Sequence, residues 1–210
     1  MAEELGKIGK PEAENFKGKR KLCVVPLLFS TENAPAEYVE KFNLYWEQVS
    51  QHIANLESKT SKINHVYHES ISMAGDEGIK FMEKLNPHCY QLTKDKCQEG
   101  AVFEATEDKE LTEEAIDWER FLFAGFVSQK VANMVSEFYV EVLRKRYQHI
   151  AKTIDETLKP GEAGMLIIRE GHMVQFPADI EVFSVAPPAL DEIHRWQRNR
   201  QSTESKEESK

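Results

Sequence analysis

The sequence lacks the features that mark secreted, membrane-spanning and metal-stapled proteins. Its three cysteines, Cys23, Cys89 and Cys97, fit neither a disulfide framework nor a zinc-ligand spacing. The N-terminal stretch has no apolar run of signal-peptide length, and no segment approaches the apolar length of a membrane span. These absences predict a cytoplasmic protein with reduced thiols and no membrane partner.

Motifs of the common cofactor and catalytic sites are also missing. The chain has no glycine-rich phosphate loop, no Gly-x-Ser-x-Gly nucleophile turn and no His-Glu-x-x-His zinc helix. It has no Glu-x-x-His sequence either, which argues against a carboxylate-bridged di-metal bundle. We therefore expect no common cofactor, and the sequence leaves any metal unknown.

The charge balance limits the choice of partner. A formal net charge of -9 disfavours binding to DNA, RNA or anionic lipid, because such binding depends on Lys and Arg contacting phosphates. Two basic clusters remain, the RKR stretch at 144–146 and the group Arg195, Arg198 and Arg200. A solvated helix face is the favoured interpretation of both. For Arg146 a snorkelling stem is favoured and an internal ion pair is second.

Hydrophobic patterning predicts an α/β organisation. The run KLCVVPLLF is typical of a buried strand, a helical stripe follows from Tyr38 to Leu56, and INHVYHESI is typical of a second strand. This order predicts a parallel crossover unit. Strand patterns return in GMLIIR and IEVFSVA, and a short helix, ALDEIHRWQR, comes last.

These patterns combine into one domain. We predict a three-layer α/β domain over residues 21–198, with a small mixed sheet built of strands from both ends of the chain. A helical insert occupies about 75–158, where the longest apolar stripe runs from Val127 to Leu158. The polar segments 1–20 and 199–210 are predicted to be flexible tails.

The stretch IIREGHMVQF raises the question of an active-site loop or a turn. Arg169-Glu170-Gly171-His172 fits a tight turn, with Met165–Ile168 and Met173–Phe176 as hairpin arms. Only ten residues separate Arg169 from Ile180, fewer than a normal parallel crossover takes. We therefore expect a hairpin or a short irregular link.

Polar residues at predicted strand ends give the enzyme hypothesis. Open parallel sheets bind ligands at the carboxyl ends of their strands, and these ends carry two imidazoles and two carboxylates. The candidate catalytic set is His68, Glu69, Glu170 and His172, which would suit a hydrolase with or without a divalent metal. Ordinary strand-end polarity is the favoured alternative, because the sequence does not fix the strand order.

The helical insert is rich in aromatic residues. Trp118, Phe121, Phe123 and Phe126 lie close together in sequence and offer more aromatic area than one helix face can bury. Core packing is the first interpretation, and a self-association surface that forms a homo-oligomer is the second.

Two segments, RKRYQHIAKTIDETLKPGEAGMLIIREG and IEVFSVAPPALDEI, resemble fragments of the α/β domains of archaeal and eukaryotic type peptide release factors and their bacterial relatives. The resemblance covers about a quarter to a third of the chain. It implies a ribosome or RNA partner. The release activity of that family resides in a Gly-Gly-Gln tripeptide, and this chain has no Gly-Gly pair, so no release catalysis is implied.

The sequence thus predicts a cytoplasmic binding or regulatory protein whose partner is an unknown protein, a ribosome or RNA. Its binding surface is expected at the strand-end edge or on the helical insert. The alternative is a hydrolase or metal-dependent enzyme that uses the strand-end His and Glu residues.

Overall fold

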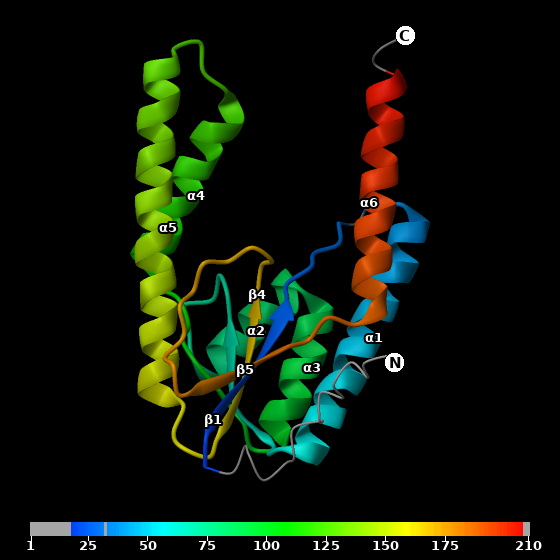
Figure 1. The fold of residues 1–210 in the computed structure, drawn as a ribbon, viewed down its shortest axis with the longest axis vertical. Helices are drawn as coiled ribbons and strands as arrows, with labels where there is room; N and C mark the ends of the chain where they lie inside the picture. Colours follow the sequence, from blue (N-terminus) through cyan, green and yellow to red (C-terminus); the bar gives the residue numbers. More distant parts are fainter. Residues whose placement is uncertain (1–17, 32, 208–210) are drawn as a thin grey trace, which may run out of the picture.

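A five-stranded sheet with helices on both faces forms the centre of the molecule (Figure 1). The computed structural model describes residues 18–31 and 33–207. The strands are β1 (Arg20–Pro26), β2 (Ile63–His68), β3 (Val102–Phe103), β4 (Ala163–Ile168) and β5 (Ile180–Ser184). The helices are α1 (Ala36–Lys59), α2 (Gly75–Leu85), α3 (Pro87–Gln98), α4 (Lys109–Ala124), α5 (Gln129–Thr157) and α6 (Pro188–Glu207).

The sheet interleaves strands from the two ends of the chain. Its order is β3-β2-β4-β1-β5, and each neighbouring pair is parallel. The predicted α/β class and the origin of the strands are confirmed. The expected mixed character is wrong, because β5 pairs parallel to β1 instead of folding back on β4.

The segment between β4 and β5 explains this difference. Residues 169–179 form an irregular link, and Met173–Phe176 contains no strand, so the hairpin alternative is wrong and the short-link alternative holds. Gly171 makes the turn at its start with a φ of 73°. Eleven extended residues span roughly 36 Å, which is enough to return along a six-residue strand of roughly 20 Å without a helix.

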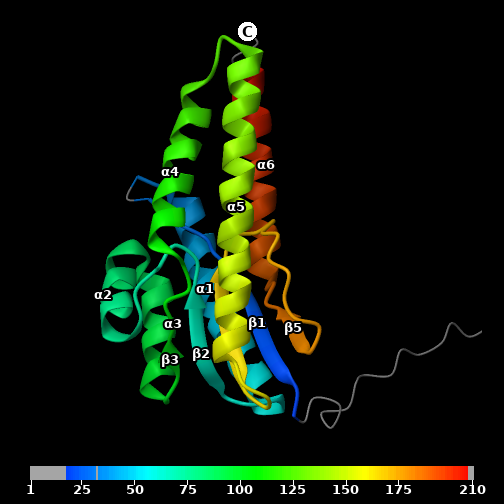
Figure 2. The same ribbon diagram turned by 90° about the vertical axis from the view of Figure 1, so that its left-hand side faces the viewer.

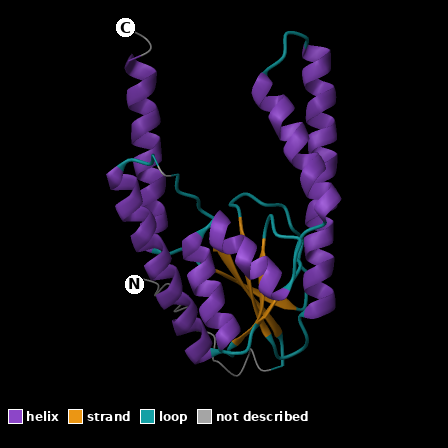
Figure 3. Ribbon diagram, turned by 180° about the vertical axis from the view of Figure 1, so that it is seen from behind, coloured by secondary structure: helices purple, strands orange, loops and turns teal. Residues whose placement is uncertain are grey.

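Alternate strand residues build two separate cores, as the period of a strand requires. On one face Val25, Val66 and Ile167 pack beneath α1, α2, α3 and α6. On the other face Leu22, Tyr67 and Leu166 pack against the C-terminal half of α5. The sheet therefore lies between two helical layers, which confirms the three-layer architecture (Figure 3).

The predicted helical insert divides into two parts around β3. Helices α2 and α3 cover the sheet, whereas α4 and the first half of α5 form an antiparallel hairpin that extends beyond the carboxyl ends of the strands (Figure 2). Helix α6 projects in the same direction beside α1 (Figure 1).

The predicted bounds of the domain and its tails stay a prediction. Helix α6 continues to Glu207 and so enters the segment predicted as a tail. Residues 1–17, most of the predicted N-terminal tail, lie outside the described residues. No helix in the described part of the chain is both long and apolar enough to cross a bilayer.

Candidate functional site

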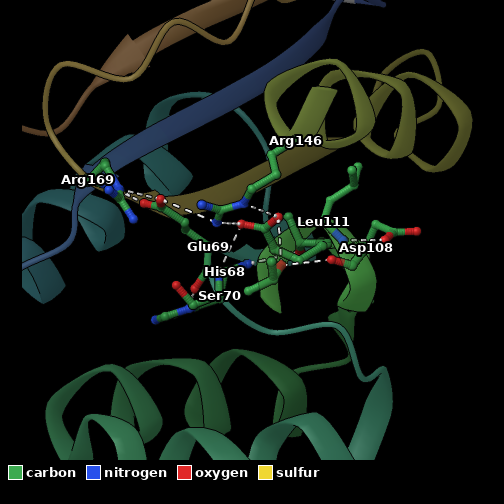
Figure 4. A network of polar contacts seen from close by, with 10 residues as sticks. His68, Glu69, Ser70, Asp108, Leu111, Arg146 and Arg169 are labelled. Carbon is green, nitrogen blue, oxygen red and sulfur yellow. Dashed lines mark hydrogen bonds and ion pairs between the residues drawn. The ribbon is translucent and has the colours of Figure 1, made fainter. Parts of the chain in front are cut away.

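The carboxyl ends of β2 and β4 are joined by an ion pair (Figure 4). Glu69 follows β2, Arg169 follows β4, and these two strands are neighbours in the sheet. The Arg169 backbone N–H donates to Glu69 Oε2 at 2.7 Å, and its guanidinium Nε donates to Oε1 of the same carboxylate. The Glu69 side chain is only 1% exposed, so this carboxylate is fully engaged within the protein.

A second ion pair attaches the helical hairpin to the same place. Arg146 of α5 donates two hydrogen bonds to Glu107, with Nε at 3.2 Å from Oε2 and Nη2 close to Oε1. Arg146 Nη2 also lies 3.7 Å from Glu69 Oε1. Two-point Arg–carboxylate contacts are the strongest of the common protein ion pairs, and removing one member leaves a buried charge. The two pairs thus form one network of two arginines and two glutamates.

The backbone around the network is shaped to fit it. Ser70 takes a φ of 75°, the only positive φ of a non-glycine residue in the described chain, and its N–H donates to Glu107 Oε1 at 3.2 Å. Asp108 caps α4 by accepting the Leu111 N–H at 2.9 Å. The turn after β2 and the start of α4 are therefore both held by carboxylates of the same segment.

His68 is the last residue of β2 and directly precedes Glu69 of this network. Its side chain is fully buried, and Nδ1 faces the Glu69 carbonyl oxygen. Because a carbonyl can only accept, the ring proton is placed on Nδ1, and Nε2 has no partner among the described residues. Burial lowers the pKa of His68 to about 4, so the imidazole is neutral at physiological pH.

Glu170 and His172 lie on the link after β4 and face different neighbours. Glu170 pairs with His194 of α6, at 2.7 Å between Oε2 and Nε2. His172 Nδ1 accepts the Val174 N–H at 3.3 Å, and its ring meets Phe176 edge-on. Burial lowers the pKa of His172, while the charge of Glu69 acts in the opposite direction.

The four predicted catalytic residues, His68, Glu69, Glu170 and His172, therefore occupy one edge of the sheet without forming a constellation. Among the described residues, no hydrogen bond or ion pair joins the side chains of any two of them. Within the described residues of the whole chain, no three or more His, Cys, Asp or Glu side chains form a group that could hold a metal ion. Their catalytic role stays a prediction.

Sequence reasoning found only part of the network, since Glu69 was in the candidate set. Arg146 gave a signal, because it flanks an apolar helical stripe, and its internal ion pair was the second interpretation. Glu107 and Arg169 gave none, since polar residues at the ends of elements are common.

A groove runs along the outer side of α5, where this helix meets the link after β4. We call it the α5 groove. It encloses about 550 Å³ and is lined by Val140, Leu143, Arg144, Tyr147, Gln148, Ala151, Met173 and Gln175. A shallower hollow of about 420 Å³ continues it along α5 and shares Val140 and Arg144 with it.

The lining of the α5 groove is apolar with one cation at its edge. Met173 is 78% exposed, which is unusual for a side chain of this type. Lys145 pairs with Glu141 at 2.8 Å, whereas Arg144 takes part in no ion pair among the described residues. Such a lining suits a ligand that is apolar along its length and carries a negative charge.

Comparisons with protein-family models, with curated proteins and with solved structures find no match for this chain. The functional argument therefore rests on the residues of the chain itself.

Proposed function

We propose that the protein is a binding module that takes an acidic amphipathic segment of a partner protein into the α5 groove. The observation that carries this proposal is an apolar groove of ligand-binding size, with Arg144 at its edge in no ion pair within residues 18–31 and 33–207. Its place, between the helical insert and the strand-end edge, agrees with the surfaces expected from the sequence. An open groove along a helix is a common docking geometry for a peptide segment.

In this proposal the strand-end polar network is structural. Each carboxylate of the network is paired with an arginine inside the protein, so it fixes the hairpin and the link that border the α5 groove. The hydrolase alternative gains no support from His68, because a buried neutral imidazole has no contact with solvent.

The cytoplasmic location and the ribosome or RNA partner are further parts of the expectation. The location is supported by three unpaired cysteines, which suit a reducing compartment. The RNA partner is less well supported, because Arg146 is buried in an ion pair and the RKR cluster loses one of its three cations. It stays a prediction of the release-factor resemblance.

The proposal can be tested with defined peptides and methyl NMR of the full chain. One helical peptide would carry leucine and phenylalanine on one face and glutamate on the other, and its control would replace each glutamate by lysine. We expect the acidic peptide to shift the methyl signals of Val140, Leu143 and Met173, which line the α5 groove. We expect the basic peptide to leave them unchanged, because it would be repelled by Arg144.

Two tryptophan variants provide the matched control. Ala151→Trp places an indole in the α5 groove and should abolish the shifts, whereas Ala54→Trp, on the exposed side of α1, should preserve them. The proposal fails if both peptides shift the same methyl groups, or if Ala151→Trp binds as the wild type does.

A further inference from the structure

The α4–α5 hairpin presents an apolar face that no other part of the described chain covers. Helix α4 packs mainly against α5, and α4 with the first half of α5 extends beyond the sheet (Figures 1 and 2). Over Lys109–Ala124 of α4 and residues 129–145 of α5, the buried side chains are those of Ala115, Val135 and Val142. A pair of helices cannot enclose a core, because each apolar stripe is wider than the seam between them.

Five apolar side chains of the hairpin are linked by ring contacts or by a shared helix face. The Trp118 ring of α4 stacks on Phe138 of α5 with centroids 5.0 Å apart, and Phe121 lies 5.9 Å from the same ring. Val131 and Met134 share a helix face with Phe138 through spacings of three, four and seven residues. We call these five residues the hairpin apolar face. Phe121 remains 55% and Met134 46% exposed.

The charges beside this face favour a particular occupant. Helix α4 carries five acidic and two basic residues, a net charge of -3. Residues 129–145 of α5 carry three basic and two acidic residues, a net charge of +1. A basic partner would be attracted to α4 and repelled by α5. A second copy of the hairpin can be related to the first by a two-fold axis parallel to the helices. Each negatively charged α4 then faces the positively charged α5 segment of the other copy.

The available area is sufficient for such a pair. Helix α4 has 16 residues and is therefore roughly 24 Å long, and two packed helices are roughly 20 Å wide. Each copy then contributes roughly 500 Å², and the pair buries about 1,000 Å², the lower limit for a specific interface. A contact of this size belongs to the class of weak, transient interfaces, so we expect a reversible dimer.

We infer that the hairpin apolar face binds a second copy of this chain, and that the two hairpins complete a four-helix bundle. The inference develops the self-association expected from the aromatic residues of the insert. It does not depend on the α5 groove, because Trp118, Phe121, Val131, Met134 and Phe138 do not line that groove.

Sedimentation equilibrium of the full chain from about 1 to 200 µM tests the inference. The wild type should fit a monomer–dimer equilibrium. Met134→Glu should weaken the dimer about 100-fold or more, because it places an unpaired charge in the interface. Met173→Glu makes the same change at an exposed methionine in the α5 groove and should leave the dimer intact. Phe121→Glu repeats the test on α4, and circular dichroism checks that each variant is folded.

Three results would overturn the inference. They are a monomer at every concentration, a dimer that survives Met134→Glu and Phe121→Glu in folded protein, and indefinite association beyond the dimer. None of them bears on peptide binding by the α5 groove, so the two proposals succeed or fail separately.

Discussion

Arg146 of α5 and Glu107, the residue before the cap of α4, form a two-point ion pair although they lie 39 positions apart in sequence. Their side chains are 4% and 0% exposed. Through Glu69, the same guanidinium is connected to the carboxyl end of β2. This arginine therefore connects the foot of the projecting hairpin to the sheet, in addition to the apolar packing of the C-terminal half of α5.

Removing this arginine should be costly. Arg146→Ala leaves the Glu107 carboxylate buried without its cation, which is expected to lower the free energy of unfolding by about 3–5 kcal/mol. Urea denaturation followed by circular dichroism would measure the loss. Lys145→Ala is the control, because its ion pair with Glu141 is exposed to solvent and its removal should change the stability little.

A double variant distinguishes a lost charge balance from a lost contact. Arg146→Met with Glu107→Leu removes both charges and keeps the volume apolar. It should recover most of the stability that Arg146→Ala loses, because neither partner is left as an uncompensated charge. A double variant as unstable as Arg146→Ala would show that hydrogen bonds from Ser70 and Thr112 to Glu107 matter more than the ion pair.

His68 should make the protein sensitive to acid. Burial lowers its folded-state pKa to about 4, below the unfolded value of about 6.5, so protons bind the unfolded chain more readily. The contribution of this group to stability is complete above pH 6.5 and is lost progressively as the pH falls to 4. The full loss is about 3 kcal/mol.

Measuring the urea midpoint between pH 7.5 and 4 would test this expectation against His68→Gln, which cannot titrate. Buried carboxylates titrate in both proteins, so their effect cancels in the difference. The free-energy difference between wild type and variant should shift by about 3 kcal/mol across this range. If the free energies of unfolding of wild type and His68→Gln keep a constant difference over this pH range, the His68 imidazole is not held in its neutral form.

Ser70 should tolerate glycine better than an ordinary serine does. Its φ of 75° costs a side-chain-bearing residue about 1–2 kcal/mol, whereas glycine adopts it freely. Ser70→Gly should therefore keep or raise the free energy of unfolding, by up to about 1 kcal/mol. The control Ser136→Gly, inside α5, should lower it by about 0.5 kcal/mol. A large loss at Ser70 would instead assign a role to its hydroxyl.

The elements of the fold could be predicted because burial leaves a local period in the sequence. The stripe from Tyr38 to Leu56 is α1, and the apolar runs around Val24 and Leu166 are β1 and β4. Strand order leaves no such trace. In the link after β4, the sequence predicted a tight turn at Gly171, and the structure has a turn there. The pairing of β5 with β1 depends instead on contacts between distant parts of the chain.

The candidate site shows the same division between local and distant information. The sequence placed His68, Glu69, Glu170 and His172 near one edge of the sheet, which is where they lie. It could not show that Glu69 would form an ion pair with Arg169, a residue 100 positions away. Charge pairing over such a distance depends on which strands are neighbours in the sheet, and a local period in the sequence does not encode strand order.

Arg144 should set the charge preference of the α5 groove. Arg144→Glu replaces the only cation of its lining by an anion, so binding of the acidic peptide should weaken by about 3- to 10-fold, the size expected of an exposed charge pair. The lysine-bearing peptide should begin to shift the methyl signals of Val140 and Met173. Lys145→Glu makes a similar charge reversal at the next position but outside the lining, and should change neither affinity by more than about 2-fold, because screening is strong between exposed charges. An equal effect of both variants would mean that net charge, and not the groove, selects the peptide.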